Sequence, residues 1–267
     1  MYSGTTFHSK SGLIVGVHQR IDRIARRTLK KQLPNEYFPS IREILHFEGN
    51  NGPDGIKRKS PARDEPWHFI DPSDPNDRQL LDQIEDHIYN LAAALRATNN
   101  ERAAFEAAWL AHAITDGLTP AHHYPFEEEV EKLRGEGRET RDTLKKKLVI
   151  SGDTRREQLV KNWKYWGAKG VMVSHVGFEH GVAAVISPQK IAPTEVHARQ
   201  LTLLEKHGYE KLFLSALSKV DSLHMYDEFL AKGWTRRLGR RTRDVLIPTI
   251  AEMVTLAWME AIKRSKP

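Results

Sequence analysis

Three side chains that commonly bind metal ions fall within eleven residues of the chain. His112 and Asp116 are four residues apart, so on a helix they lie one turn apart on the same face. An imidazole nitrogen and a carboxylate oxygen can then reach one cation. Gly117 and Pro120 end the helix and turn the chain, which brings His122 back toward the same point. This spacing predicts a metal site at the end of a helix.

The alternative is an ordinary ion pair, which is the commoner meaning of an isolated His-x3-acid pair. The residues around this pair are apolar, however, and leave no clean polar face: Leu110, Ala111, Ala113, Ile114 and Leu118. We therefore expect His112 and Asp116 to point inward. A buried carboxylate is costly unless it is paired or bound to a metal. With His122 added, we favour a metal site.

A second pair with the same spacing, His175 and Glu179, lies inside the apolar stretch 171–186. Two such pairs in two apolar helices are hard to explain as coincidental ion pairs. The chain has no cysteine, so any metal must be held by nitrogen and oxygen ligands. Thirteen histidines make zinc the first candidate.

Three further residues are weaker candidates when each is taken alone. His18 lies on a predicted helix, where a lone histidine is usually a surface or satisfied core residue. His68 stands between Trp67 and Phe69, so it is either a buried structural residue or a ligand. Asp54 lies between proline and glycine, where an aspartate most often forms a turn.

Taken together, the candidates form the series His18, Asp54, His68, His112-x3-Asp116-x5-His122 and His175-x3-Glu179. This series resembles the ligands of the zinc-dependent phospholipase C family and of the related single-strand-specific zinc nucleases. The order, the fourteen-residue gap from Asp54 to His68 and the His-Phe-x-Asp-Pro context at 68–72 all agree. The resemblance implies an all-α fold, a trinuclear zinc cluster in a cleft between helices, and phosphodiester hydrolysis.

The resemblance also implies a role for each ligand. The first zinc would be held by Asp54, His68, His112 and Asp116. The second would be held by His122, His175 and Glu179. A third would be bound by His18, with Asp116 as a bridge. Metal-bound hydroxide would attack phosphorus, and Asp54 would serve as the catalytic base that orients it.

The chain departs from the family pattern in two places. In the family, the third metal is completed by the amine and carbonyl of an N-terminal Trp, whereas this chain begins Met1-Tyr2. We expect the third metal to be weakly held or absent, with His8 or Met1 as the residues that could substitute. The segment between His122 and His175 is also longer than in the family. We expect its charged part, about 126–169, to cover or reshape the cleft rim.

Hydrophobic periodicity predicts the helices that position these residues. The predicted helices cover 12–33, 38–47, 79–97, 101–117, 171–186, 194–208, 209–232 and 242–264. A basic cluster lies between the last two: Arg236, Arg237, Arg240, Arg241 and Arg243. No Pro/Gly/Ser linker divides the 267 residues, so we expect a single all-α, multi-helix domain over 1–267.

Charge and composition limit the possible partners and the cellular compartment. A net charge of +6 favours anionic partners such as phosphates, nucleic acid or an acidic membrane surface. Residues 1–12 have no apolar signal-peptide core, and the longest apolar region, 245–259, is broken by Pro248 and Glu252. We expect no transmembrane segment and a cytoplasmic protein, with peripheral contact to an anionic surface. The oligomeric state is not indicated.

The sequence therefore predicts a zinc-dependent phosphodiester hydrolase, phospholipase C-like, that binds two or three zinc ions and acts on a phospholipid headgroup or a related phosphodiester. One alternative is a zinc nuclease, in which Trp67, Phe69 and Tyr124 stack a base and the basic clusters at 57–59 and 236–243 follow the backbone. Another is a non-catalytic, metal-stabilised binding protein in which the metal only holds helices together.

Overall fold

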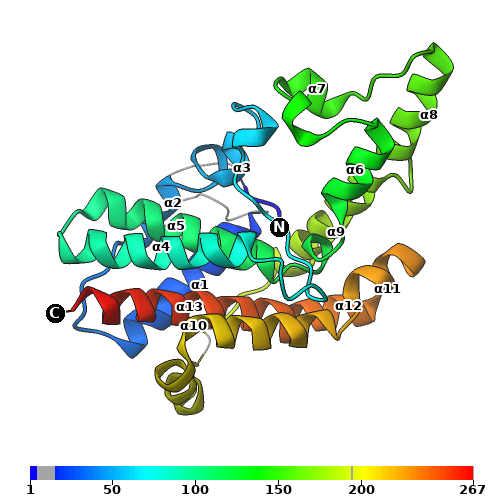
Figure 1. Ribbon diagram of the computed structural model, residues 1–267. Helices are drawn as coiled ribbons and strands as arrows, with labels where there is room; N and C mark the ends of the chain where they lie inside the picture. Colours follow the sequence, from blue (N-terminus) through cyan, green and yellow to red (C-terminus); the bar gives the residue numbers. More distant parts are fainter. Residues whose placement is uncertain (5–15, 194, 267) are drawn as a thin grey trace.

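The computed structural model describes residues 1–4, 16–193 and 195–266, and within these it contains helices and no strand (Figure 1). The predicted all-α fold class is confirmed. The α-helices are α1 (Val17–Gln32), α2 (Ile41–His46), α3 (Pro53–Ile56), α4 (Gln79–Arg96), α5 (Asn100–Gly117), α6 (Phe126–Arg134), α7 (Leu144–Leu148), α8 (Arg155–Trp166), α9 (Val171–Ile186), α10 (Ala198–Asp221), α11 (Met225–Lys232), α12 (Arg236–Arg241) and α13 (Ile247–Ser265). Short turns of other helix types are η2 (Gly49–Asn51), η3 (Ala62–Asp64), η4 (Pro120–His122), η5 (Arg138–Thr140) and the π-helical η6 (Thr242–Leu246).

Most predicted helices lie close to their expected positions, because each has an apolar period and a clear end. α9 has the predicted bounds, and α4 and α5 differ from theirs by one residue. α10 continues through the predicted boundary at Gly208, but this residue has a φ of +76° and kinks the helix there. The first residues of the helix predicted over 12–33 and the histidine at position 8 lie outside the described residues.

The basic cluster corrects one prediction. Its arginines were expected to connect two helices, but Arg236–Arg241 form α12, which runs through η6 into α13. Thr235 starts this helix by accepting a hydrogen bond from the backbone N–H of Leu238 at 3.1 Å. Leu238 is buried and anchors one side of the short helix, so the arginines around it extend from the other sides.

α13 is the central helix of the body and packs against α1, α4, α5 and α10 (Figure 1). Its Trp258 is fully buried and donates a hydrogen bond from Nε1 to the Ala107 carbonyl of α5 at 3.0 Å. The continuous helical stretch Arg236–Ser265 is long and apolar enough to cross a membrane by length and composition. However, 78% of its most apolar window is buried inside the protein, as expected of a core helix.

The charged insertion predicted at about 126–169 forms α6, η5, α7 and α8, which extend away from the body at the upper right of Figure 1. We call residues 126–166 the α6–α8 lobe. Its own small core contains Phe126, Val130, Ile150 and Tyr165. The chain then returns to the body through α9, so the lobe is placed directly between two segments that carry candidate metal ligands.

Two glycines of α9 provide a matched test of how this helix packs. A Cβ atom at Gly181 would lie 1.7 Å from Nε1 of Trp234, whereas at Gly177 the nearest atom is Cζ of Phe229 at 3.4 Å. We predict that Gly181→Ala lowers the free energy of unfolding by about 1–3 kcal/mol through overpacking. Gly177→Ala should raise it by up to about 1 kcal/mol through helix propensity. Thermal denaturation compares the two, and equal melting temperatures would contradict the packing.

Candidate metal centre

α5 is the helix that presents the first ligand pair. The Asn99 side chain caps its start by accepting from the Arg102 backbone N–H at 3.1 Å, and the helix ends at Gly117. Six alanines are buried along it, which lets neighbouring helices approach closely: Ala103, Ala104, Ala107, Ala108, Ala111 and Ala113. His112 and Asp116 are each only 1% exposed, so both point inward as the apolar context predicted.

Asp116 is surrounded by nitrogen atoms. Its Oδ1 lies 2.5 Å from the amino nitrogen of Met1 and 3.3 Å from Nε2 of His18. Its Oδ2 lies 2.5 Å from Nδ1 of His68 and 3.2 Å from Nε2 of His112. Burial by itself raises the pKa of Asp116, but these positive and polar neighbours outweigh it and hold the pKa well below its ordinary value. The carboxylate is therefore ionised in a site closed to solvent.

Asp54, His68 and His112 form the first candidate ligand group, with one ligand atom of each within 4.8 Å of the others. Asp54 stands on the short helix α3, and its Oδ1 lies 3.8 Å from Nε2 of His112. Burial and the charge of Lys57 lower the pKa of His68 to about 3, so its ring is neutral at pH 7. Nδ1 carries the proton that Asp116 accepts, which leaves Nε2 with a lone pair. Within the described chain, this Nε2 has no hydrogen-bond partner.

His122, His175 and Glu179 form the second group. Nε2 of His122 and Nε2 of His175 lie 3.0 and 3.2 Å from the same Glu179 oxygen, Oε1. The backbone carbonyl of His68 can only accept a hydrogen bond, so Nδ1 of His122, 2.7 Å away, must be the protonated nitrogen. Burial lowers the pKa of His122 to about 4, so its Nε2 carries a lone pair at pH 7.

In the second group, the Nε2 lone pair of His122 therefore faces the Glu179 carboxylate oxygen at hydrogen-bond distance, with no proton between the two atoms. A cation bound between the two atoms would make that contact favourable. The Met1 amine, 3.4 Å from Glu179 Oε1, supplies one positive charge nearby. A zinc ion accepts both imidazole nitrogen and carboxylate oxygen, so the donor set fits zinc. In the first group, the Nε2 lone pair of His68 has no partner in the described chain and is likewise available to a zinc ion.

His18, which the resemblance assigns to a third metal, lies beside Asp116 and Met1. Its Nε2 is 2.7 Å from the Met1 carbonyl oxygen, and its ring stacks on that of His112 with centroids 3.9 Å apart. The Met1 ammonium thus lies against Asp116 and the Met1 carbonyl oxygen against His18, and the substitution of Met1 for the tryptophan stays a prediction. The occupancy of this third position stays a prediction.

Glu48 is a buried residue that the sequence did not single out. Its Oε2 lies 3.5 Å from Nδ1 of His112, on the side of the ring away from Asp54 and Asp116. Glu48, His18 and His112 also form a third group of possible ligands. A carboxylate behind a ligating histidine fixes the ring and strengthens it as a ligand. Burial lowers the pKa of His112, but Asp116, Glu48 and Asp54 outweigh it and raise the pKa to about 10.

One sequence pattern does indicate the side of the site on which His18 and Glu48 lie. Asp22 follows His18 by four residues, which is the His-x3-acid spacing of the other two pairs. Asp22 is buried, and burial together with the charge of Glu48 raises its pKa well above the ordinary value. Nothing in the sequence around Glu48, which lies in a Gly- and Asn-rich turn, marks that residue.

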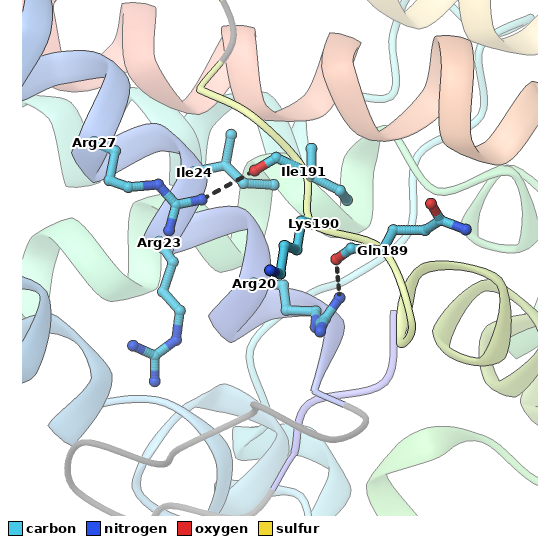
Figure 2. Close-up of a pocket in the computed structure, with 7 residues that line it drawn as sticks. All are labelled: Arg20, Arg23, Ile24, Arg27, Gln189, Lys190 and Ile191. Atoms are coloured by element: carbon cyan, nitrogen blue, oxygen red, sulfur yellow. Dashed lines mark hydrogen bonds between the residues drawn. The ribbon is translucent and has the colours of Figure 1, made fainter.

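α9 is tied to α1 at its C-terminal end. Arg20 of α1 donates to the carbonyl oxygens of Ser187 at 2.8 Å and Gln189 at 3.3 Å, and Arg27 donates to that of Ile191 at 3.2 Å. Figure 2 shows the contacts to Gln189 and Ile191 within the pocket that these residues help to line. The helix that carries His18 and the helix that carries the second group are therefore held together.

The three aromatic residues predicted to contact substrate line one hollow beside His122, with a volume of about 100 Å³. Phe69 stacks on Phe126 with centroids 5.5 Å apart, Trp67 lies under the guanidinium of Arg138, and Tyr124 packs against Tyr226. Four acidic residues also line the hollow: Asp71, Asp77, Glu127 and Glu128. One of these, Glu127, pairs with Arg141 at 2.5 Å.

Comparisons with known proteins show the fold. No protein-family model matches the chain, and no curated protein matches its sequence. Among solved structures, the chain is similar to the alpha-toxin of Clostridium perfringens from avian strain SWCP, with a TM-score of 0.63 and 13% identity. The alignment covers 99% of this chain and 66% of the toxin chain, so this chain spans about two thirds of the toxin's length. At this identity the likeness establishes a shared fold.

Asp116→Asn tests whether the buried carboxylate holds metal. We predict that this variant loses at least about one equivalent of bound zinc, because a neutral amide cannot offset the repulsion of nearby dications. It should lose more zinc than His18→Ala. Zinc per chain is measured after gel filtration of zinc-saturated protein.

Glu106→Gln is the matched control for this experiment. Glu106 is also a buried carboxylate on α5, and it pairs with Nδ1 of His87 at 2.5 Å, ten residues from Asp116. We expect it to retain the zinc content of the wild type. Equal zinc content in Asp116→Asn and Glu106→Gln would contradict the assignment.

Glu48→Gln tests the support behind His112. The change keeps the shape but removes the charge facing Nδ1, so we predict zinc binding that is about 10- to 100-fold weaker. Competition with a chromogenic chelator measures the affinity, and Glu106→Gln again serves as control. An affinity unchanged from the wild type would show that Glu48 has no part in the centre.

Proposed function

We propose that the protein is a zinc-dependent phosphodiester hydrolase, phospholipase C-like, that acts on a phospholipid headgroup. One observation carries the proposal: neutral His68 and His122 both have Nδ1 engaged as a donor, which leaves each with an Nε2 lone pair. The lone pair of His122 faces the Glu179 carboxylate, and that of His68 has no hydrogen-bond partner in the described chain. The shared fold with the alpha-toxin and the ligand series of the zinc phospholipase C family support the same class.

The residues that would hold zinc are those of the first and second groups, with Asp116 between them. Bound zinc would supply a water activated at neutral pH and would offset the charge of the phosphate. Asp54 is the group suited to orient that water and take its proton, because its side chain is 28% exposed while Asp116 is closed to solvent. Lys57 lies 3.3 Å from Asp54 Oδ1 and keeps this carboxylate ionised.

The hollow beside His122 supports a phospholipid substrate over a nucleic acid. Aromatic faces together with carboxylates favour a cationic group, such as the ammonium of a zwitterionic headgroup. The same carboxylates would repel the continuous phosphate backbone of a single-stranded nucleic acid. The phosphodiester of such a headgroup would bind at the two ligand groups, and its ammonium would bind in the hollow. Each charge of the headgroup would then face groups of opposite charge.

The test is a pair of assays on zinc-loaded protein, with bis(p-nitrophenyl) phosphate and with phosphatidylcholine as substrates. We predict hydrolysis of both, loss of activity with a chelator, and its return with zinc. Asp54→Asn should lower kcat by about a hundredfold or more, because it removes the base. Glu106→Gln, which lies outside the centre, is the control.

Three results would count against the proposal. Zinc binding without hydrolysis of either substrate would favour a metal that only holds the helices together. Faster cleavage of single-stranded DNA than of phosphatidylcholine would favour the nuclease. Full activity in Asp54→Asn would show that Asp54 is not the catalytic base.

A further inference from the structure

The α6–α8 lobe exposes an unusual amount of apolar surface. Of the eleven large hydrophobic side chains that are exposed in the described residues, seven lie within 144–166. They are Leu144, Leu148, Val149, Leu159, Val160, Trp163 and Trp166. Scattered exposed hydrophobics are normal, but a concentration of this kind marks an interaction site.

α8 carries the main part of this surface as a stripe. Leu159, Trp163 and Trp166 stand at i, i+4 and i+7, and they are 72%, 73% and 42% exposed. Tyr165, on the opposite side, is buried in the small core of the lobe. An amphipathic helix normally turns its apolar stripe toward the protein core. In α8 the stripe faces away from it.

α7 continues the stripe. Leu144 and Leu148 are one turn apart on α7, and both are exposed. Nε1 of Trp166 donates to the Leu148 carbonyl oxygen at 2.7 Å, which joins the end of α7 to the end of α8. The seven exposed side chains therefore belong to one region, which we call the α7–α8 apolar surface.

The charge around this surface is strongly positive. Residues 143–170 contain eight lysines and arginines and two acidic residues, a net charge of +6 that equals the net charge of the whole chain. Arg155, Arg156, Lys164 and Lys169 are exposed on or beside α8. Apolar and aromatic side chains flanked by Lys and Arg are typical of helices that lie in the interface of an anionic membrane.

We propose that the α7–α8 apolar surface docks the protein onto an anionic phospholipid membrane. Trp163 and Trp166 suit the headgroup level, with an apolar ring and a polar N–H, and Leu159 and Val160 would enter the acyl region. The inference deepens the proposed function, because it brings the hydrolase to the surface that contains its substrate. Docking itself does not require catalysis.

The lobe also connects this surface to the candidate centre. Phe126 belongs to the same small core as Tyr165 of α8, and its ring centroid lies 4.9 Å from that of His175. α8 also packs directly against α9, the helix of His175 and Glu179. A membrane-bound lobe would therefore hold the second ligand group close to the lipid surface.

Other occupants fit the surface less well. Five of the seven side chains are aliphatic, and these neither stack on bases nor bind phosphate, so a nucleic acid would leave them unused. A second copy of the chain would bring two regions of net charge +6 together. An anionic lipid surface satisfies both the aliphatic side chains and the charge.

The test is co-flotation of the full-length, zinc-loaded protein with vesicles of equimolar phosphatidylglycerol and phosphatidylcholine, and with vesicles of phosphatidylcholine alone. We expect binding to the first, weaker binding to the second, and a blue shift of tryptophan fluorescence on binding. The double variant Leu159→Gln/Trp163→Gln should bind the anionic vesicles at least about tenfold more weakly. The control is Tyr89→Gln/Leu230→Gln, which removes two exposed hydrophobics outside the lobe and should bind as the wild type does.

Three outcomes would overturn the proposal. They are no vesicle binding by the wild type, equal binding by the lobe variant and the control, and a wild-type dimer that the lobe variant converts to monomer. Circular dichroism confirms that both variants fold. Hydrolysis of bis(p-nitrophenyl) phosphate by the wild type reports on the proposed function separately, so docking without hydrolysis would leave this inference standing.

Discussion

The burial of the Asp116 carboxylate is the constraint on which the rest of the site depends. An ionised carboxylate that is 1% exposed must be surrounded by positive or donating groups, because its desolvation is otherwise prohibitive. The amine of Met1, His18, His68 and His112 converge on it from four separate segments of the chain. The arrangement of α1, α5 and the segment around 68 can therefore be understood as a shell built around one negative charge.

The body and the lobe contribute different features to the protein. α13 and the buried alanines of α5 give the body a rigid core, which fixes His112 and Asp116 to a helix packed on several sides. Arg20 ties α9 to α1, so the second ligand group is held in place against the first. The lobe adds the α7–α8 apolar surface with its positive charge, and its small core contacts His175. The rigid candidate ligands and the exposed apolar surface are thus provided by different parts of one chain.

The sequence predicts the helices well and the site in part. The two His-x3-acid pairs point to His112, Asp116, His175 and Glu179 by spacing alone, and the structure brings each pair together. His18, Asp54 and His68 needed the family resemblance, because a lone histidine or a turn aspartate has no distinctive pattern. The sequence does not indicate Glu48, because the position of this residue depends on how α2 packs against α5. The stripe Leu159, Trp163 and Trp166 has helical spacing in the sequence, but only the fold shows which way it faces. The many charges of this segment are typical of a solvated connection, so the sequence does not indicate an exposed apolar surface there.

We expect zinc to bind among these candidate ligands. The most direct measurement is a crystal structure of zinc-saturated protein, with anomalous diffraction collected on both sides of the zinc absorption edge. We expect anomalous peaks between Asp54, His68 and His112 and between His122, His175 and Glu179, with Asp116 adjacent to the first. Peaks confined to surface histidines, with Asp116 bonded only to protein nitrogens, would contradict it.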